Sequence, residues 1–347
     1  MTTTGLALYD RTAERGSAQV IAAYSTSFGL ASRLCSAPVR THVAAVYALV
    51  RIADEVVDGP AAQAGLDVAQ RRAVLDGLEA ETERAMATGY SANLVVHAFA
   101  TTARATGFGP ELTRPFFASM RRDLDPVRFA DRAELDEYVH GSAEVVGLMC
   151  LRAFLLGLPE DPERDRRCED GARHLGAAFQ KVNFLRDLAE DVQALGRSYL
   201  PDVPADGFDE EAKHRVLDDI DHDLAIAVRV IPELPSSSRR AVAAAAALFG
   251  ALSAKLRRTP AEELLTTRIR VSTPRKLVLL AGAYAGVVPR AAGRAGGEPA
   301  GAGGPADVHE HAGTDEHGDA VEPASAEEHE HANADTPSPV DARKALA

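Results

Sequence analysis

Tryptophan is absent from this chain of 347 residues, and aromatic residues of all kinds make up only 5% of it. Aromatic and β-branched residues are favoured in strands, whereas Ala, Leu and Arg, which are abundant here, are good helix formers. No segment alternates polar and apolar residues as a half-buried strand does. The composition therefore predicts an all-α protein and argues against a β-sandwich.

Cysteine is scarce and widely spaced, at positions 35, 150 and 168, and no Cys-x-x-Cys pair occurs. This spacing argues against a zinc site and against a disulfide framework. We expect Cys35, Cys150 and Cys168 to be free thiols in a reducing cytoplasm.

Long apolar runs are also missing. The longest one near the C-terminus, residues 277–288, is shorter than the roughly 20 residues that a membrane-spanning helix needs. The first residues lack the basic and apolar regions of a secretory signal. We therefore expect a cytoplasmic protein, and the sequence leaves open a peripheral contact with the inner face of a membrane.

The chain has no basic stripe of the kind that binds nucleic acid, and its net charge is −13. It also has no Gly-rich loop of the dinucleotide-binding or phosphate-binding type. We expect no nucleic-acid partner. A cluster near the end of the folded part, Arg268, Arg270, Arg275 and Lys276, is open to two interpretations: contact with a diphosphate or an anionic lipid surface, or an ordinary basic turn.

The acidic charge is concentrated at the C-terminus. Residues 290–347 hold 12 acidic against 4 basic side chains, are rich in Gly, Ala, Pro, Glu and His, and show no apolar periodicity. We expect a disordered tail, because such a composition cannot bury enough apolar surface to fold. Its histidines leave metal scavenging as the alternative to a solvated acidic tail.

The remaining chain, residues 1–289, reads as a single helical domain. Apolar spacing of 3.6 residues, interrupted by Pro and Gly, predicts ten helices. They span 14–30, 38–58, 67–88, 91–106, 110–122, 132–156, 164–193, 209–229, 235–256 and 273–288. We expect a single large bundle around a central apolar cavity.

One of these helices carries acids in an apolar setting, VAAVYALVRIADEVVD at 43–58. At about 100° per residue, Asp54 and Asp58 share a face with Tyr47 and Val50, while Glu55 points about 100° away. Buried carboxylates are costly unless they are paired or bind a metal. The pair at i and i+4 suits one hard cation such as Mg²⁺; the alternative is a salt bridge to Arg51 on a wet surface.

A second polar stripe lies in FQKVNFLRDLAEDV at 179–192, where Asn183, Asp187 and Asp191 follow at intervals of four. An amide and two carboxylates in register form a set of Mg²⁺ ligands. The alternative is the polar face of an ordinary amphipathic helix. If both stripes face one cavity, they could hold Mg²⁺ ions and a diphosphate between them.

Together, DEVVD and NFLRDLAED resemble the squalene/phytoene synthase family of head-to-head prenyltransferases. Further segments resemble the family in the expected order over residues 14–288, and the likeness is nearest to bacterial phytoene synthases. These segments are YSTSFGLASRL (24–34), SMRRDL (119–124), YVHGSAEVVG (138–147), GRSYLP (196–201) and RVSTPRKL (270–277). The chain departs from many relatives at His140 and Glu144, and no family counterpart is known for the tail.

The resemblance implies an isoprenoid synthase fold and the condensation of two geranylgeranyl diphosphates, through a cyclopropyl diphosphate, to phytoene in carotenoid biosynthesis. The implied ion is Mg²⁺, with Mn²⁺ as the alternative, and no NADPH is expected. The implied metal ligands are Asp54, Asp58, Asn183, Asp187 and Asp191. The implied diphosphate contacts are Arg51, Arg186, Gln180 and Ser27.

Tyr138 matches a family position that lines the reaction centre. Small residues on inner helix faces (Ala44, Ala48, Ala143 and Gly147) would leave room for long prenyl chains, or else allow close helix packing. The alternatives left open are a squalene, dehydrosqualene or hydroxysqualene synthase that uses farnesyl diphosphate, a terpene cyclase, and a non-catalytic helical protein of the same fold. The oligomeric state is left undetermined.

Overall fold

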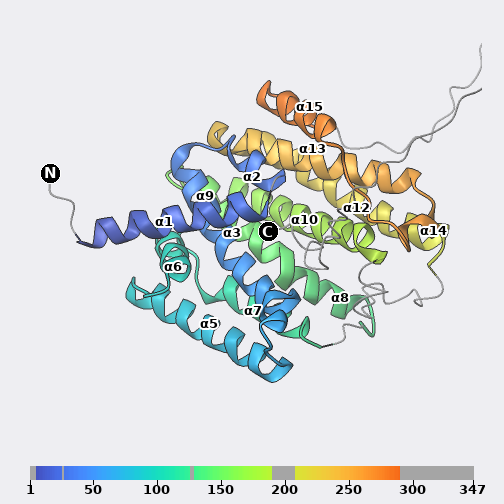
Figure 1. Cartoon of the computed structure of the whole chain (residues 1–347). Helices are drawn as coiled ribbons and strands as arrows, with labels where there is room; N and C mark the ends of the chain where they lie inside the picture. Colours follow the sequence, from blue (N-terminus) through green and yellow to red (C-terminus); the bar gives the residue numbers. More distant parts are fainter. Residues whose placement is uncertain (1–4, 26, 126–128, 190–207, 290–347) are drawn as a thin grey trace, which may run out of the picture. The chain divides into compact units, whose positions relative to one another are not determined.

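The computed structural model describes residues 5–25, 27–125, 129–189 and 208–289. Within these ranges the regular structure is helical and no strand occurs (Figure 1). This confirms the predicted all-α class. The predicted tail, residues 290–347, lies outside the described residues.

Eleven described helices have eight or more residues. They are α1 (Gly5–Tyr24), α3 (Ala37–Asp58), α5 (Val68–Thr88), α6 (Leu94–Thr106), α7 (Pro110–Arg122), α8 (Arg132–Val139), α9 (Val145–Leu155), α10 (Pro162–Arg186), α12 (Glu210–Val230), α13 (Ser236–Arg258) and α15 (Thr273–Tyr284). Short elements lie between them: α2 (Ser27–Ser32), α4 (Pro60–Gln63), the π-helix η1 (His140–Glu144), the 3₁₀-helix η2 (Ile231–Glu233) and α14 (Ala261–Leu264).

Local sequence signals set many helix ends. Asp67 caps α5 by accepting the amide of Gln70 at 2.8 Å, while the side chain of Gln70 accepts the amide of Asp67 at 2.9 Å. Such a capping box satisfies two amides that the first helical turn leaves unpaired. Gly89 and Gly107 end α5 and α6 with φ of 84° and 76°, a left-handed conformation that glycine adopts without steric cost.

Helix α10 contacts α12, α13, α9 and η1, whereas α3 contacts α1, α5, α6, α7 and α9. Figure 1 shows α15 lying along the outside of α13, with α5 at the opposite side of the helical unit. One apolar cluster joins α3, α5, α6, α7 and α9, and a second joins α10, α12 and α13. Burial of these apolar faces is the main force that holds such a bundle together.

The predicted helix 132–156 contains one π-helical turn, η1, between α8 and α9. Helix α10 passes close to this turn at Gly176, where an added Cβ would lie 2.7 Å from the carbonyl oxygen of Ala143. Only glycine allows this approach. The extra residue of a π-turn shifts the helix register, and such turns are common at functional sites.

Two predicted helices are interrupted. The prediction of one helix over 14–30 is wrong, because α1 runs from Gly5 to Tyr24 and a break at Ser25 precedes α2. The Oγ of Ser25 accepts the amide of Phe28 at 3.1 Å and so starts the new helix. The predicted helix 164–193 is also broken, because α10 ends at Arg186 and Asp187 has non-helical ψ of 8°.

None of the helices in the four described ranges combines the length and the apolar character needed to cross a bilayer.

Candidate active site

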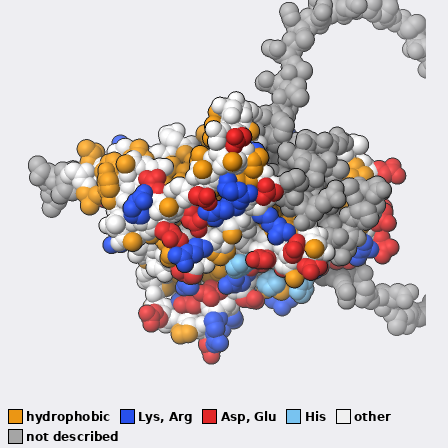
Figure 2. All heavy atoms as spheres, turned by 90° about the horizontal axis from the view of Figure 1, so that it is seen from below, with side chains coloured by type: hydrophobic (Ala, Val, Ile, Leu, Met, Phe, Trp, Pro, Cys, Tyr) orange, Lys and Arg blue, Asp and Glu red, His pale blue; other side chains and the backbone are white. Residues whose placement is uncertain are grey.

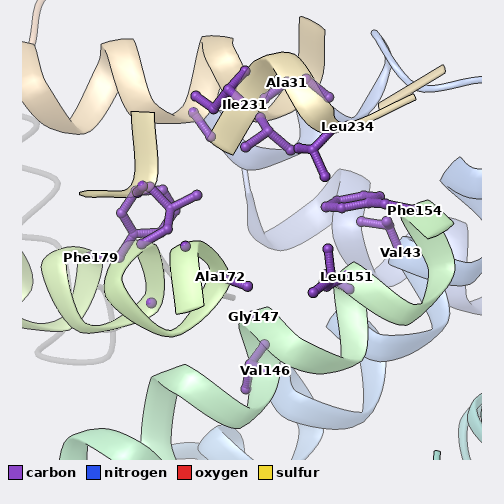
Figure 3. A pocket seen from close by; sticks show the side chains of 18 of the residues that line it. Ala31, Val43, Val146, Gly147, Leu151, Phe154, Ala172, Phe179, Ile231 and Leu234 are labelled. Carbon is purple, nitrogen blue, oxygen red and sulfur yellow. The ribbon is translucent and has the colours of Figure 1, made fainter. Parts of the chain in front are cut away.

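An apolar cavity lies between α3, α9, α10, α12 and α13, and it has about 880 Å³ of empty space counting its open mouth. Figure 3 shows Val43, Leu151, Phe154, Phe179, Ile231 and Leu234 around this space. The predicted central apolar cavity is therefore present. Such a wall suits an apolar ligand.

The four small residues expected to make room in the cavity divide into two pairs. Ala143 and Gly147 line the cavity, whereas Ala44 and Ala48 are buried elsewhere in the packing of α3. Gly147 also packs closely, since an added Cβ would lie 2.7 Å from the carbonyl oxygen of Ala172. Ala143 and Gly147 therefore widen the cavity, and Gly147 also allows close helix packing; that the space takes prenyl chains stays a prediction.

Helix α3 places the first carboxylate pair away from bulk solvent. Asp54 is 6% exposed and Asp58 is half-buried. Arg51 is 1% exposed, pairs with Glu55, and its guanidinium carbon lies 4.4 Å from the centre of the Tyr24 ring. Asp54 and Arg51 are therefore buried in the helix packing and do not lie on a wet surface.

Arg51 keeps one donor available for a ligand. Its Nε is buried and has no hydrogen-bond partner among the described residues. An unpaired buried donor costs free energy, which an anionic oxygen placed there would recover. Glu55 pairs with Arg51, and its exclusion from the metal ligands stays a prediction.

The second polar stripe is buried as well. Every residue from 176 to 189 is buried, with Gln180, Asn183 and Asp187 at 6%, 6% and 3% exposure. The alternative of a solvated amphipathic face is therefore wrong. Asn183 Oδ1 has no hydrogen-bond partner among the described residues, which fits an acceptor that awaits a cation or a donor.

Asp187 already has basic partners. The Nε of Arg186 donates to one Asp187 oxygen at 2.8 Å, and the Nε of Arg268 lies 3.0 Å from the same oxygen. Although α10 ends here, the amide of Asp187 still donates to the carbonyl of Asn183 at 2.9 Å. The two predicted ligands therefore remain one helical turn apart. Asp191 lies outside the described residues.

Both carboxylate helices also form the cavity wall, α3 through Val43 and α10 through Gly176 and Phe179. At about 1.5 Å per residue, Asp54 lies roughly 16 Å further along α3 than Val43, and Asp187 roughly 12 Å further along α10 than Phe179. Asp54 and Asp187 thus lie about two to three turns beyond the apolar wall, whereas Gln180 directly follows Phe179 and Asn183 lies about one turn beyond it.

The residue types fit Mg²⁺, which takes one or two carboxylates and completes its shell with water and substrate phosphate. In the described part of the chain, no three His, Cys, Asp or Glu side chains are grouped as a metal site. Metal ligation by Asp54, Asp58, Asn183, Asp187 and Asp191 stays a prediction. The same holds for Ser27, which begins α2 but whose side chain is not among those described.

Tyr138 is held in a buried setting beside the second stripe. Its ring centre lies 6.2 Å from that of Phe184, the residue after Asn183. Its hydroxyl donates to both carboxylate oxygens of Asp123, at 2.9 and 3.0 Å. The Tyr138 ring is therefore fixed close to the polar part of α10.

A model of the squalene/phytoene synthase family matches residues 21–275 of this chain. The chain belongs to this family. The match covers both acidic stripes up to Asp191 and the segment that contains Tyr138, so it confirms the resemblance seen in the sequence motifs.

Individual relatives in the family show how far the similarity extends. The 15-cis-phytoene synthase of Paracoccus sp. (strain N81106 / MBIC 01143) is 28% identical over 280 residues, which cover 76% of this chain and 88% of that protein. The presqualene diphosphate synthase of Rhodopseudomonas palustris (strain ATCC BAA-98 / CGA009) is 31% identical over 185 residues, or 52% of this chain and 59% of that protein. A crystal structure of a dehydrosqualene synthase in complex with ligand has a TM-score of 0.64 at 22% identity, covering 80% of this chain and 96% of that one; it supports the fold alone.

Two residues of this squalene/phytoene synthase family member were not assigned to the site from sequence. Asp123, in the SMRRDL segment, holds Tyr138, and its place in a family-like segment was the available signal. Arg268 was noted only within a basic cluster, yet it pairs with Asp187. Burial lowers the pKa of Lys276, and the positive charges of Arg186 and Arg270 lower it further. Because Arg186 ends α10, the basic cluster of Arg268, Arg270, Arg275 and Lys276 reaches this end of α10.

His140 and Glu144, the departures from many family members, do not line the cavity. His140 Nδ1 lies 2.9 Å from a carboxylate oxygen of Glu144, and Arg173 lies 3.6 Å from the same carboxylate. These residues form a polar cluster on η1 and α10.

Proposed function

We propose that this protein is a phytoene synthase, which joins two molecules of geranylgeranyl diphosphate head to head in carotenoid biosynthesis. The observation that carries the proposal is that two helices each have an apolar part and a buried polar part. Helices α3 and α10 both wall an apolar cavity and both hold buried polar side chains further along. The similarity to the Paracoccus 15-cis-phytoene synthase over most of both chains favours this member of the family.

The two polar stripes, on α3 and on α10, bind the diphosphates of the substrates. Arg51 and Arg186 supply positive charge, and Gln180 and Ser27 supply neutral donors. The residues that would hold Mg²⁺, or Mn²⁺ in its place, are Asp54, Asp58, Asn183, Asp187 and Asp191. The ions, when bound, neutralise charge that develops on the departing diphosphate.

The apolar cavity guides the carbon chemistry. The C–O bond of one substrate breaks, and its electron pair leaves with the diphosphate. The double bond of the second substrate attacks the resulting allylic cation, and loss of a proton gives a cyclopropyl diphosphate. The second diphosphate then departs, the cation rearranges, and loss of another proton gives phytoene. The wall excludes water, which would otherwise quench each cation.

Tyr138 matches a family position that lines the reaction centre, although its side chain is 2% exposed and is not among those that line the apolar cavity. Its role is to stabilise a cation through its ring face once substrate reaches it, since aromatic faces attract positive charge. The Asp123 carboxylate accepts a hydrogen bond from the Tyr138 hydroxyl and so fixes the ring.

One experiment tests the assignment of substrate and product. The purified protein is incubated with Mg²⁺ and either geranylgeranyl or farnesyl diphosphate, with and without NADPH, and the extracted hydrocarbons are identified. We expect a forty-carbon product from geranylgeranyl diphosphate without NADPH, and none after chelation of the metal. A thirty-carbon product, or no product, would overturn the proposal.

A farnesyl-diphosphate enzyme is the second candidate. The similarity to the presqualene diphosphate synthase of Rhodopseudomonas palustris favours it. Squalene, dehydrosqualene or hydroxysqualene as the product of the same incubation would identify this alternative.

We further propose that residues 1–289 form the catalytic domain, that residues 290–347 are a disordered acidic tail, and that the protein works in the cytoplasm. Removal of residues 295–347 should leave the rate unchanged. A truncated protein that folds but is inactive would contradict this division.

A further inference from the structure

Four basic side chains line one hollow between the end of α13 and the start of α15: Lys255, Arg258, Arg270 and Arg275. No acidic residue lines this hollow. In the described part of the chain none of the four forms an ion pair, whereas neighbouring Arg257 is held by Asp218 and Asp221. The hollow therefore carries uncompensated positive charge.

The helix beside this hollow exposes apolar side chains. Leu277, Val278, Tyr284 and Val287 are 55%, 61%, 63% and 62% exposed. At about 100° per residue, the first three fall within an arc of about 120° on α15. An ordinary surface helix turns polar residues outward, so this face is unusual.

The charge and the apolar face form one surface. A groove along α13 and α15 is lined by residues that include Arg258, Arg275, Val278 and Val287, so it shares two arginines with the hollow. Among the described residues, its one acidic lining residue, Asp221, is paired with Arg257. Residues 264–289 contain no Asp or Glu, although the whole chain has a net charge of −13. By contrast, the face in Figure 2 carries acidic and basic side chains interspersed.

We propose that this α13–α15 surface (Arg258, Arg270, Arg275, Leu277, Val278, Tyr284 and Val287) docks the protein on an anionic lipid bilayer. Basic residues beside an exposed apolar helix face are typical of interfacial helices, which attract anionic headgroups and bury apolar side chains at the acyl boundary. The hollow receives headgroup phosphate, and Tyr284 lies at the interface, where aromatic residues are enriched.

This inference rests on the proposed function in one respect. A forty-carbon hydrocarbon product is insoluble in water, so an enzyme docked on a bilayer can release it into a lipid phase. The docking surface itself is argued from the charge and exposure of described residues.

The test uses the full-length protein, without substrate, and vesicles of phosphatidylglycerol mixed with phosphatidylcholine or of phosphatidylcholine alone. We expect binding to the anionic vesicles only, with affinity that falls as salt rises. The triple variant R258Q/R270Q/R275Q should lose about a hundredfold in affinity, because each Arg near an anionic surface contributes about fivefold.

The matched control is R114Q/R132Q/R215Q, which removes equal charge from arginines that are 67%, 51% and 55% exposed elsewhere. It should bind as the wild type does. For the apolar face, V278S/V287S should weaken binding about tenfold, whereas V68S/V74S, at exposed valines of α5, should not.

Three results would overturn the proposal. One is equal loss of binding in both triple variants, which would indicate net charge alone. Another is a wild-type protein that does not bind anionic vesicles but forms dimers, while V278S/V287S is monomeric. That result would make the surface an interface between copies of the chain. The third is release of the protein from vesicles by inorganic diphosphate when chloride at the same ionic strength does not release it. That result would make the hollow a diphosphate site. Product formation is measured separately in detergent, so its failure cannot be confused with these.

Discussion

The hydroxyl of Tyr138 lies 2.9 Å from one carboxylate oxygen of Asp123 and 3.0 Å from the other, and both residues are 2% exposed. Asp123 follows the last turn of α7, and Tyr138 lies near the end of α8. The bond therefore joins two helices at the point where the chain enters the π-turn η1. It fixes the aromatic ring that faces Phe184 on α10.

Replacement of Tyr138 by Phe should destabilise the protein. A buried hydrogen bond to a charged group contributes about 1.5–3 kcal/mol, and Tyr138→Phe removes it while it keeps the ring. Urea denaturation followed by circular dichroism would measure the loss. Tyr284→Phe, at a residue 63% exposed, is the control and should stay within about 0.5 kcal/mol of wild type. Equal stability of the two variants would show that the Asp123 bond does not hold the fold.

The two carboxylate stripes should respond differently to loss of charge. Asp58 is half-buried, so Asp58→Asn should cost at most about 1 kcal/mol of stability while turnover falls about a hundredfold or more. Asp187 is 3% exposed and pairs with Arg186 and Arg268, so Asp187→Asn should cost about 3–5 kcal/mol as well as activity, because it breaks buried ion pairs.

Thermal unfolding and hydrocarbon product assays of both variants would separate these effects. Asp218→Asn, at an acid 74% exposed on α12, serves as the control for both measurements. A fully active Asp58→Asn would remove Asp58 from the metal site, and an Asp187→Asn as stable as Asp58→Asn would contradict the importance of the two arginines.

Features set by neighbouring residues were predictable from the sequence. The helix predicted over 38–58 matches α3, because Pro38 begins it and Gly59 ends it. The burial of Asp54 was also predictable, since valines and alanines surround it. The break at Ser25 was not, because it depends on which amide its hydroxyl accepts. The contact of Arg268 with Asp187 was beyond prediction too, since it joins segments far apart in sequence.

Glycine at position 176 should be irreplaceable, because an added Cβ would lie 2.7 Å from the carbonyl oxygen of Ala143 and 3.0 Å from the Cα of Glu144. We expect Gly176→Ala to destabilise the protein by about 1–3 kcal/mol, as overpacking against backbone does. Gly77→Ala on α5, where nothing lies within 4 Å, should instead stabilise it by about 0.5–1 kcal/mol. Denaturant midpoints of the pair measure both. A neutral Gly176→Ala would mean that η1 can shift away from α10.

The three thiols of the chain, Cys35, Cys150 and Cys168, all line the apolar cavity, and burial shields them from reaction. Burial raises the pKa of Cys35 to about 12 and that of Cys150 to about 12, and it also raises the pKa of Cys168. Only the thiolate is nucleophilic. We therefore expect almost no labelling of the folded protein by iodoacetamide at pH 8, and labelling of all three thiols in denaturant.

The stability of the folded protein should fall, and the labelling of its thiols should rise, as the pH increases above 9. Because the folded state keeps its thiols protonated above their ordinary pKa of 9.0, the stability they contribute is complete below pH 9 and declines as the pH rises toward 12. Labelling of the folded protein should accordingly increase through this range instead of levelling off near pH 9. A prenyl diphosphate bound in the cavity should slow the labelling further, because it covers the same wall. Rapid labelling at pH 8, unaffected by prenyl diphosphate, would show that these thiols are open to solvent and that the cavity wall is arranged differently.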